Sequence, residues 1–519
     1  MPGERDQRKE HDQVALADQD MKAAIAVTRF GLGARPGEID KARSDPQGFL
    51  KAQIRRSGAD QPAGPAPTSI QRMAEFRTYQ RERREVRLEK ASDVRPAKPA
   101  AAPMDAVGPA MADAAPGKGD ARDPVKVVGN MLRQDISSDF AARTQLAAST
   151  DAGFRERWTL FWANHFTVSA TKAITGTVVG PFEEEAIRPH VFGRFEELLV
   201  AAETHPAMLT YLDQIQSIGP DSEQARNMRN GFAGRGPAGF GGANLQKAAQ
   251  RTPGLNENLA REIMELHTVG VNGGYTQADV TEFARAMTGL SIGGERDGVY
   301  GEAVFRGQAH EPGSRMVMGV RYDESGKAQA GAILADLAGK PQTAQFICAK
   351  LARHFVADDP PPALVARLQA AWTGSGGDLA KVADALITAP EAWDPAPAKF
   401  KTPYEFIVSS YRAAGALPVG FQQVGPILTA LGQKPFSAPS PKGWPEDAQS
   451  WAAPDAIVKR MQFAQAFSAG AVQDRDPKAL AADALGDRLS PDTAKAIARA
   501  ESRPEGFALL LMSPEFQRR

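Results

Sequence analysis

The sequence predicts a mainly α protein, with one large multi-helical domain, a short β-hairpin and disordered insertions. Apolar residues recur at helical spacing along most of the chain, whereas runs of strand type are scarce. At 519 residues the chain has room for two or three average domains or one large one. We expect a flexible tail at 1–20, then a single helical domain over 21–519 with low-complexity insertions at about 92–124 and 220–250.

The bulk composition is that of an ordinary soluble chain and points to no nucleic-acid partner. Hydrophobic residues make up 42% of the sequence and charged residues 24%, and 62 basic residues balance 62 acidic ones. The single cysteine, Cys348, excludes an internal disulfide and a thiolate zinc cluster. It lies in the helical pattern "TAQFICAKLARHF", which predicts a buried, inert thiol.

No run of about 18 apolar residues occurs, so no transmembrane helix is predicted. The first twenty residues are charged, and "AIAV" is too short for the core of a signal peptide. We therefore expect this chain, as written, to be cytoplasmic.

The N-terminal third is predicted to be helices around one insertion. The stretch "SDPQGFLKAQI" begins a helix with Ser44 or Asp45 as N-cap and Pro46 at the first helical position. A charged helix follows over 69–91, where Glu interleaved with Arg favours a solvated face over nucleic-acid binding. Residues 92–124, rich in Ala, Pro and Gly, cannot bury enough apolar surface to fold.

The rest of the chain alternates helices with a few loops. "RERWTLFWANHFTVS" and the segments after it are helical, up to a glycine-rich stretch inside 220–250 that matches no phosphate-binding pattern. Alternation in "RMVMGVRY" predicts the hairpin. Helices then resume, and a Pro/Trp-rich loop, "FSAPSPKGWPEDAQSW", precedes the last ones.

The densest polar stretch is "NENLAREIMELHTVGVNGGYTQADVTEFARAMTG", residues 256–289. It predicts a helix that starts near Asn256 or Asn258 and ends by Gly270. Thr276 and Asp279 fit a capping box for a second helix that buries Val280, Phe283 and Met287. Capping, an apolar stripe and a Glu257–Arg261–Glu265 ladder explain most of this stretch, but they do not require Asn258, Glu262 or His267.

Seven histidines occur, and five lie in patterned contexts: His165, His205, His267, His310 and His354. Three of them are candidate ligands of a divalent metal, because imidazole with carboxylate suits Zn, Fe, Mn or Ni: His165, His267 and His310. The candidate catalytic residues are Glu262, Glu265, His267 and His310. The candidates for positioning a substrate are Asn258, Arg261 and Arg315.

Two functions remain open at this point. One is a metal- or carboxylate-dependent hydrolase or oxidoreductase built on these side chains. The other is a non-enzymatic scaffold in which each His is satisfied in the core and the cluster only fixes helix geometry. A serine hydrolase is disfavoured, because the chain has no Gly-x-Ser-x-Gly elbow and lacks strands to carry one.

Ordered landmarks from about residue 28 to 450 resemble the bacterial family called domain of unknown function 1800. They include "TRFGLGARPGEI", "RERWTLFWANHFTVS", the 256–289 stretch, "HEPGSRMVMG", "LARHFVADDPP" and "LGQKPFSAPSPKGWP". The resemblance implies a largely helical fold, a partner protein resembling sulfatases, and export. The chain departs from the family in having no recognisable signal peptide, and in carrying Glu311 and Arg315 where the family usually shows Asp and Lys.

Overall fold

The computed structural model describes residues 19–93, 124–233, 254–396, 399–472 and 474–519. The predicted tail at 1–20 and insertion at 92–124 lie almost wholly outside these residues. The predicted insertion at 220–250 lies partly outside them, but its first part forms helix α10 (Glu223–Ala233). The Arg226 N–H donates to the Ser222 carbonyl oxygen at the start of this helix.

Helices dominate the described chain, as predicted. The N-terminal half contains α1 (Gln19–Ile25), α2 (Glu38–Arg43), α3 (Pro46–Lys51), α4 (Ser69–Asp93), α5 (Pro124–Ser149), α6 (Gly153–His165), α7 (Ala173–Phe182), α8 (Phe195–Glu203), α9 (Pro206–Tyr211), α12 (Asn258–Glu262) and α13 (Gln277–Met287). The C-terminal half contains α14 (Lys327–Gly339), α15 (Pro341–Phe355), α16 (Pro362–Ser375), α17 (Leu379–Thr388), α18 (Pro403–Ala413), α19 (Gly425–Ala430), α20 (Ala448–Trp451), α21 (Pro454–Ala471), α22 (Pro477–Leu485), α23 (Pro491–Ala498), α24 (Arg503–Met512) and α25 (Pro514–Gln517).

Strands in the described residues form two small antiparallel pairs. The predicted hairpin is confirmed as β3 (Arg315–Val317) with β4 (Val320–Tyr322), in which Val317 pairs with Val320. Its turn residues, Met318 and Gly319, both have positive φ, which is the geometry of a type I′ turn. The second pair, β1 (Leu290–Ile292) with β2 (Ala303–Phe305), was not predicted, because neither strand is long enough to show alternation.

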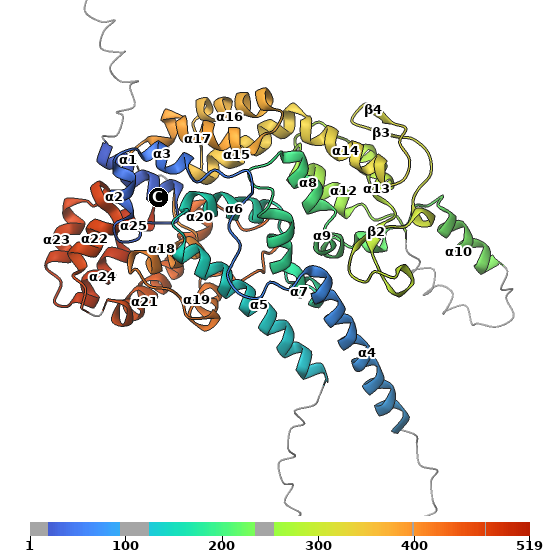
Figure 1. Cartoon of the computed structure of the whole chain (residues 1–519), viewed down its shortest axis with the longest axis horizontal. Helices are drawn as coiled ribbons and strands as arrows, with labels where there is room; N and C mark the ends of the chain where they lie inside the picture. The colour runs from blue at the N-terminus through green and yellow to red at the C-terminus, as the bar shows by residue number, and fades with distance from the viewer. Residues whose placement is uncertain (1–18, 94–123, 234–253, 397–398, 473) are drawn as a thin grey trace, which may run out of the picture.

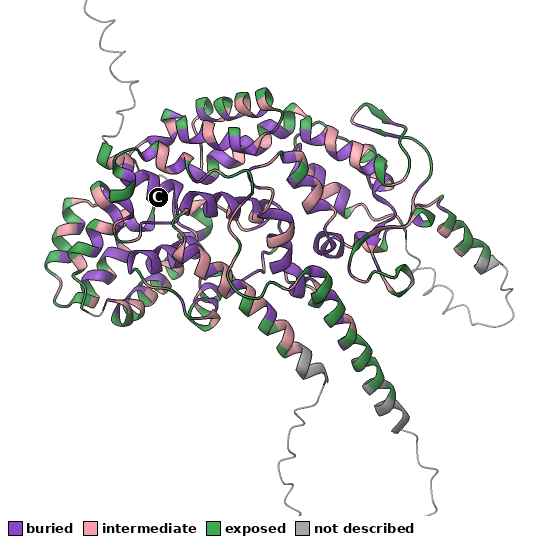
Figure 2. Ribbon diagram, viewed as in Figure 1, coloured by how far each residue is buried: buried purple, intermediate pink, exposed green. Residues whose placement is uncertain are grey.

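The helices enclose a continuous core that contains residues from Ala23 in α1 to Phe516 in α25. Helix α6 runs through the middle of the body (Figure 1) and carries the largest buried side chains, including Trp158 and Trp162. α15, α16 and α17 lie along one side, and α21 to α25 gather at one end (Figure 1). α4 and α5 project from the body, and the outer part of α4 is mostly exposed (Figure 2). No helix in the described ranges is long and apolar enough to cross a membrane.

Local capping follows the predicted chemistry. Asp45 caps α3 by accepting a hydrogen bond from the Gly48 N–H, with Pro46 at the first helical position. Thr276 and Asp279 form the capping box of α13. One difference appears in 256–289: after α12 the chain continues as a π-helix, η4 (Ile263–His267), instead of an α-helix that reaches Gly270. π-turns of this kind alter the direction of side chains and occur often at functional sites.

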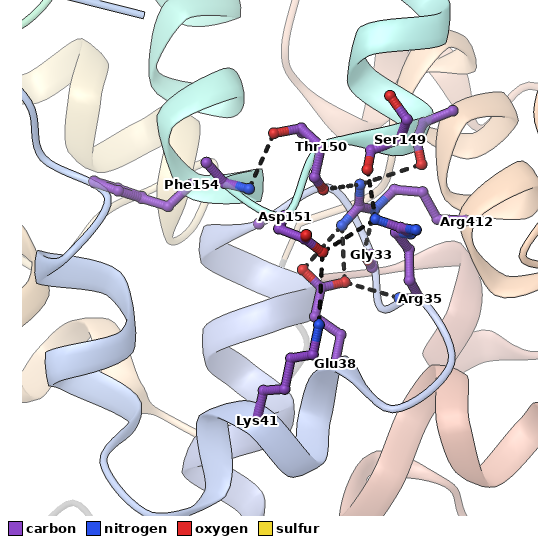
Figure 3. A network of polar contacts seen from close by, with 12 residues as sticks. Gly33, Arg35, Glu38, Lys41, Ser149, Thr150, Asp151, Phe154 and Arg412 are labelled. Atoms are coloured by element: carbon purple, nitrogen blue, oxygen red, sulfur yellow. Dashed lines mark hydrogen bonds and ion pairs between the residues drawn. The ribbon is translucent and has the colours of Figure 1, made fainter. Parts of the chain in front are cut away.

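Buried ion pairs tie distant segments of the core together. In Figure 3 Nη2 of Arg412, from α18, donates to both carboxylate oxygens of Glu38, at 3.0 and 2.8 Å. The same guanidinium donates to the carbonyls of Gly33 and Thr150. It therefore joins the N-terminal helices, the end of α5 and α18. Losing either charge would leave the other buried and unpaired, so this network is a specific stability determinant.

Candidate active site

The structure brings two of the predicted histidines together in the core. His165, His267 and Glu203 lie at the ends of α6, η4 and α8, respectively. The His165 and His267 ring centroids are 5.7 Å apart, and His165 Nε2 lies 3.2 Å from the His267 carbonyl oxygen. His267 Nδ1 lies 2.6 Å from Glu203 Oε1, although the contact lacks the angle of an aligned hydrogen bond. These groups are almost fully buried, so the pair is sealed from solvent.

His165 is held uncharged in this cluster. Its Nδ1 lies 2.8 Å from the Lys350 ammonium group on α15. Burial first, and then the charges of Lys350 and His267, lower the pKa of His165 well below its ordinary value. Both nitrogens of the uncharged imidazole are thus paired, one with a backbone carbonyl and one with a lysine. The hydrogen bonding of His165 is therefore satisfied without any ligand.

Glu262 and Glu265 are half-buried residues near this cluster. Burial raises the pKa of Glu262, and Glu262 is close enough to His267 and Glu203 for their charges to act on it, His267 lowering and Glu203 raising its pKa. Arg261 pairs with Glu257 at 3.2 Å and bonds to Gln277, while Asn258 is exposed. These contacts link α12 to α13, as a structural role requires.

His310 and Arg315 belong to the hairpin region. His310 Nδ1 lies 2.9 Å from the Thr288 carbonyl oxygen, and Arg315 pairs with Glu282 at 3.1 Å. Within the part of the chain that the structure describes, no three His, Cys, Asp or Glu side chains are placed to hold a metal ion. The predicted ligand set His165, His267 and His310 is therefore not assembled: two members meet in the core, and the third bonds to a different helix end.

A cleft lies elsewhere, between α5, α6, α15, α18 and the loop 431–447. Its cavity volume is about 110 Å³. None of the predicted site residues lines it. Its polar wall consists of Arg143, Arg157, Asn164, Thr167, Glu183, His354, Thr402, Glu405, Gln433, Lys434, Glu446 and Arg519, and aromatic residues such as Phe140, Tyr404, Phe436 and Trp444 complete it.

His354 is the chemically distinctive residue of this wall. Its Nδ1 lies 2.7 Å from Glu446 Oε1, whereas its buried Nε2 has no hydrogen-bond partner among the described residues. Burial would raise the pKa of Glu446, but His354, Lys399 and Lys350 together hold it below its ordinary value. Because the ionised Glu446 can only accept, Nδ1 carries the proton and Nε2 keeps its lone pair. Burial also lowers the pKa of His354, so the ring is neutral at pH 7.

The negative charge of a second buried carboxylate in the wall, that of Glu405, is balanced by arginines. Glu405, at the start of α18, contacts the Arg157 guanidinium and lies 2.9 Å from that of Arg519. Burial would raise the pKa of Glu405, but the two arginines hold it well below its ordinary value. Arg519 also donates to the His354 carbonyl oxygen at 2.5 Å, so this ion cluster fixes the end of α15 beside the cleft.

The loop 431–447 is fixed over the cleft by Asn164. The Asn164 amide donates to the Trp444 carbonyl oxygen at 3.0 Å, and the Trp444 N–H donates back to Asn164 Oδ1 at 2.8 Å. Gly443 has φ +85°, and a Cβ there would lie 2.4 Å from the Asn164 carbonyl oxygen, so only glycine allows this approach. Phe436 has φ +48°, which is a strained backbone conformation for an aromatic residue. Strained backbone conformations occur often at functional sites.

The cleft is lined by residues that neighbour the predicted ones in the same sequence landmarks. In "WANHF" the predicted residue, His165, points into the core, whereas the preceding Asn164 lines the cleft. His354 in "LARHF" was noted as patterned but not placed in the site. Its partner Glu446 lies in the Pro/Trp-rich loop, 92 residues later. The length of that loop and its Pro and Trp residues could have pointed to it, because long loops often carry functional residues.

The fold and cleft define a mainly α-helical protein with a buried His–Glu pair on the wall of a loop-covered cleft. The family described as "Protein of unknown function (DUF1800)" matches residues 25–518, and the chain belongs to this family. No curated protein and no solved structure matches the chain.

Proposed function

We propose that the protein is a hydrolase in which His354 acts as a general base on water. The observation that carries this proposal is the pairing at His354: Nδ1 is bound to an ionised Glu446 while Nε2 is free of partners in the described structure. A carboxylate–histidine pair sets the tautomer and orientation of the ring, and it stabilises the imidazolium that forms when the ring accepts a proton. His165, by contrast, has both ring nitrogens engaged, by the His267 carbonyl oxygen and the Lys350 ammonium group.

The reaction step requires a water molecule to reach Nε2 of His354, which is buried in this structure. Nε2 takes a proton from water as the water oxygen bonds to an acyl carbon, and the imidazolium then returns that proton to the leaving group as its bond to carbon breaks. Burial raises the pKa of Tyr404 to about 12, against opposing effects of Arg143 and the Thr144 hydroxyl. Tyr404 therefore stays protonated at neutral pH, and its buried hydroxyl can donate to an oxygen that gains charge in the cleft.

Hydrolysis of an activated ester, 4-nitrophenyl acetate, tests the role of His354 as a general base. The reaction needs only a base, a water molecule and enough space in the cleft for the ester. We expect His354→Gln to lower kcat/KM by about 10²- to 10⁴-fold, the usual contribution of a general base. His190→Gln is the matched control, since His190 is only half-buried and lies outside the cleft wall. The rate should fall on the acid side below pH 6.5, because the pKa of His354 lies below its ordinary value. Equal rates in the two variants would refute the proposal.

A scaffold is the second candidate, and the projecting helices favour it. α4 packs against α5 and α7 at its base, and its outer part presents a charged, exposed surface away from the body (Figure 2). A partner protein, such as the sulfatase-like one suggested by resemblance, has an accessible surface there. This role predicts that His354→Gln leaves partner binding intact, whereas substitutions at exposed positions of α4, such as Arg84→Glu, weaken it in a pull-down with that partner.

A further inference from the structure

The charges of the cleft identify the class of molecule that it would bind. Each carboxylate in the wall already faces a cation or His354: Glu183 lies 3.0 Å from Arg143, Glu405 contacts Arg157 and Arg519, and Glu446 contacts His354. With His354 neutral, four cations (Arg143, Arg157, Lys434 and Arg519) stand against three carboxylates, which leaves one positive charge in excess.

Lys434 is the cation that supplies this excess. It lies on the loop 431–447, it is exposed, and no described carboxylate lies within ion-pair distance of it. A second exposed cation of the same loop, Lys442, also has no ion pair among the described residues, and its charge lowers the pKa of Lys350 behind the His–Glu pair. The covering loop therefore presents uncompensated positive charge at the mouth of the cleft.

The inner wall supplies apolar surface and polar atoms that are unpartnered within the described structure, among them the Tyr404 hydroxyl and His354 Nε2. The Arg143 guanidinium lies over the rings of Tyr404 and Phe436 at 5.2 and 5.4 Å, so this wall is largely aromatic. The His354 side chain is about nine-tenths buried, and its Nε2 is unpartnered in the described cleft. A molecule that satisfies both regions has an anionic end for Lys434 and an apolar or aromatic part within the cleft.

We propose that the cleft binds a small monocarboxylate with an apolar or aromatic body, held by Lys434 at the mouth. Among the residues that line the cleft, Lys434 is the one cation in excess, and a single cation suits a monoanion better than a dianionic phosphate ester; Lys442 does not line the cleft. This inference rests on the proposed function, since it names the substrate class of the same site. The anion's charge lies at the mouth, and the bond to be hydrolysed lies toward His354.

Binding of benzoate and of its neutral counterpart benzamide, measured by isothermal titration calorimetry on the full chain, tests the proposal. We expect benzoate to bind more tightly than benzamide. Lys434→Gln should weaken benzoate about 2- to 5-fold, as for a solvent-exposed ion pair, and Lys434→Glu about 4- to 25-fold. Lys478→Glu is the matched control, since Lys478 is exposed on α22 and outside the cleft wall, and it should leave both ligands unchanged.

The outcomes separate this inference from the hydrolase proposal. Benzoate binding that persists in His354→Gln, together with equal ester hydrolysis by His354→Gln and His190→Gln, would retain the carboxylate site and refute the general base. Equal binding of benzoate and benzamide, no binding of either, or equal effects of Lys434→Glu and Lys478→Glu would overturn the carboxylate site. Tighter binding of phenyl phosphate than of benzoate would also overturn it, in favour of a phosphate ligand.

Discussion

Removing the Asn164 amide tests whether this side chain holds the loop 431–447 over the cleft. Asn164→Ala deletes two hydrogen bonds to the Trp444 backbone, of 3.0 and 2.8 Å. Each bond contributes about 0.5–1.5 kcal/mol net, so local opening of the loop should become easier by about 2 kcal/mol. That free energy corresponds to a roughly 30-fold larger open population, since every 1.4 kcal/mol is tenfold.

Hydrogen exchange followed by mass spectrometry on the peptide 440–447 measures this opening. The Gly443 amide is a useful reporter, because its own acceptor, the Ser440 carbonyl, is untouched by the substitution. We expect its exchange to speed up by about 30-fold in Asn164→Ala. Asn164→Asp keeps the acceptor for the Trp444 N–H but loses the donor, so its effect should be intermediate. Asn130→Ala, an exposed Asn on α5, is the control.

If the exchange rate of the Gly443 amide increased by less than about threefold, the proposed role of Asn164 would be refuted. That increase is smaller than the loss of one hydrogen bond of average strength would cause. Such a result would show that the loop's other anchors suffice. Those anchors are the Lys399 ammonium group, which donates to the Glu446 carbonyl oxygen at 2.6 Å, and Ser169, which donates to the Ala438 carbonyl oxygen at 2.6 Å.

Three further predictions concern stability and reactivity. Glu38→Gln leaves the buried Arg412 guanidinium without its carboxylate and should cost about 3–5 kcal/mol in urea unfolding; a loss no larger than that of Asp40→Asn on the surface would contradict the network. Burial lowers the pKa of Lys350 from 10.5 to about 8. Between pH 8 and 10.5 the unfolded chain therefore binds more protons at this lysine than the folded chain does. The stability of the protein relative to Lys350→Met should therefore rise from pH 8 to 10.5, and a constant difference would argue against it. Burial raises the pKa of the Cys348 thiol, so Ellman's reagent should label it only after unfolding, and rapid labelling of the native protein would show that the thiol is accessible.

The sequence by itself was sufficient to predict the helical class, the family, the β3–β4 hairpin and the caps at Asp45 and Thr276. These features depend on neighbours a few residues apart, and hydrophobic spacing and capping chemistry report such neighbours directly. The same local logic placed Val280, Phe283 and Met287 in the core, where they are fully buried.

Only the tertiary structure decided which polar residues meet. His354 and Glu446 are 92 positions apart, and Arg157 and Glu405 are 248 apart, so no pattern along the chain could pair them. The π-turn at 263–267 also gave His267 a direction that α-helical spacing does not predict, toward Glu203 in the core. Helix periodicity tells which face is apolar, but the partner of a buried charge depends on which helices pack together, and that is a property of the whole fold.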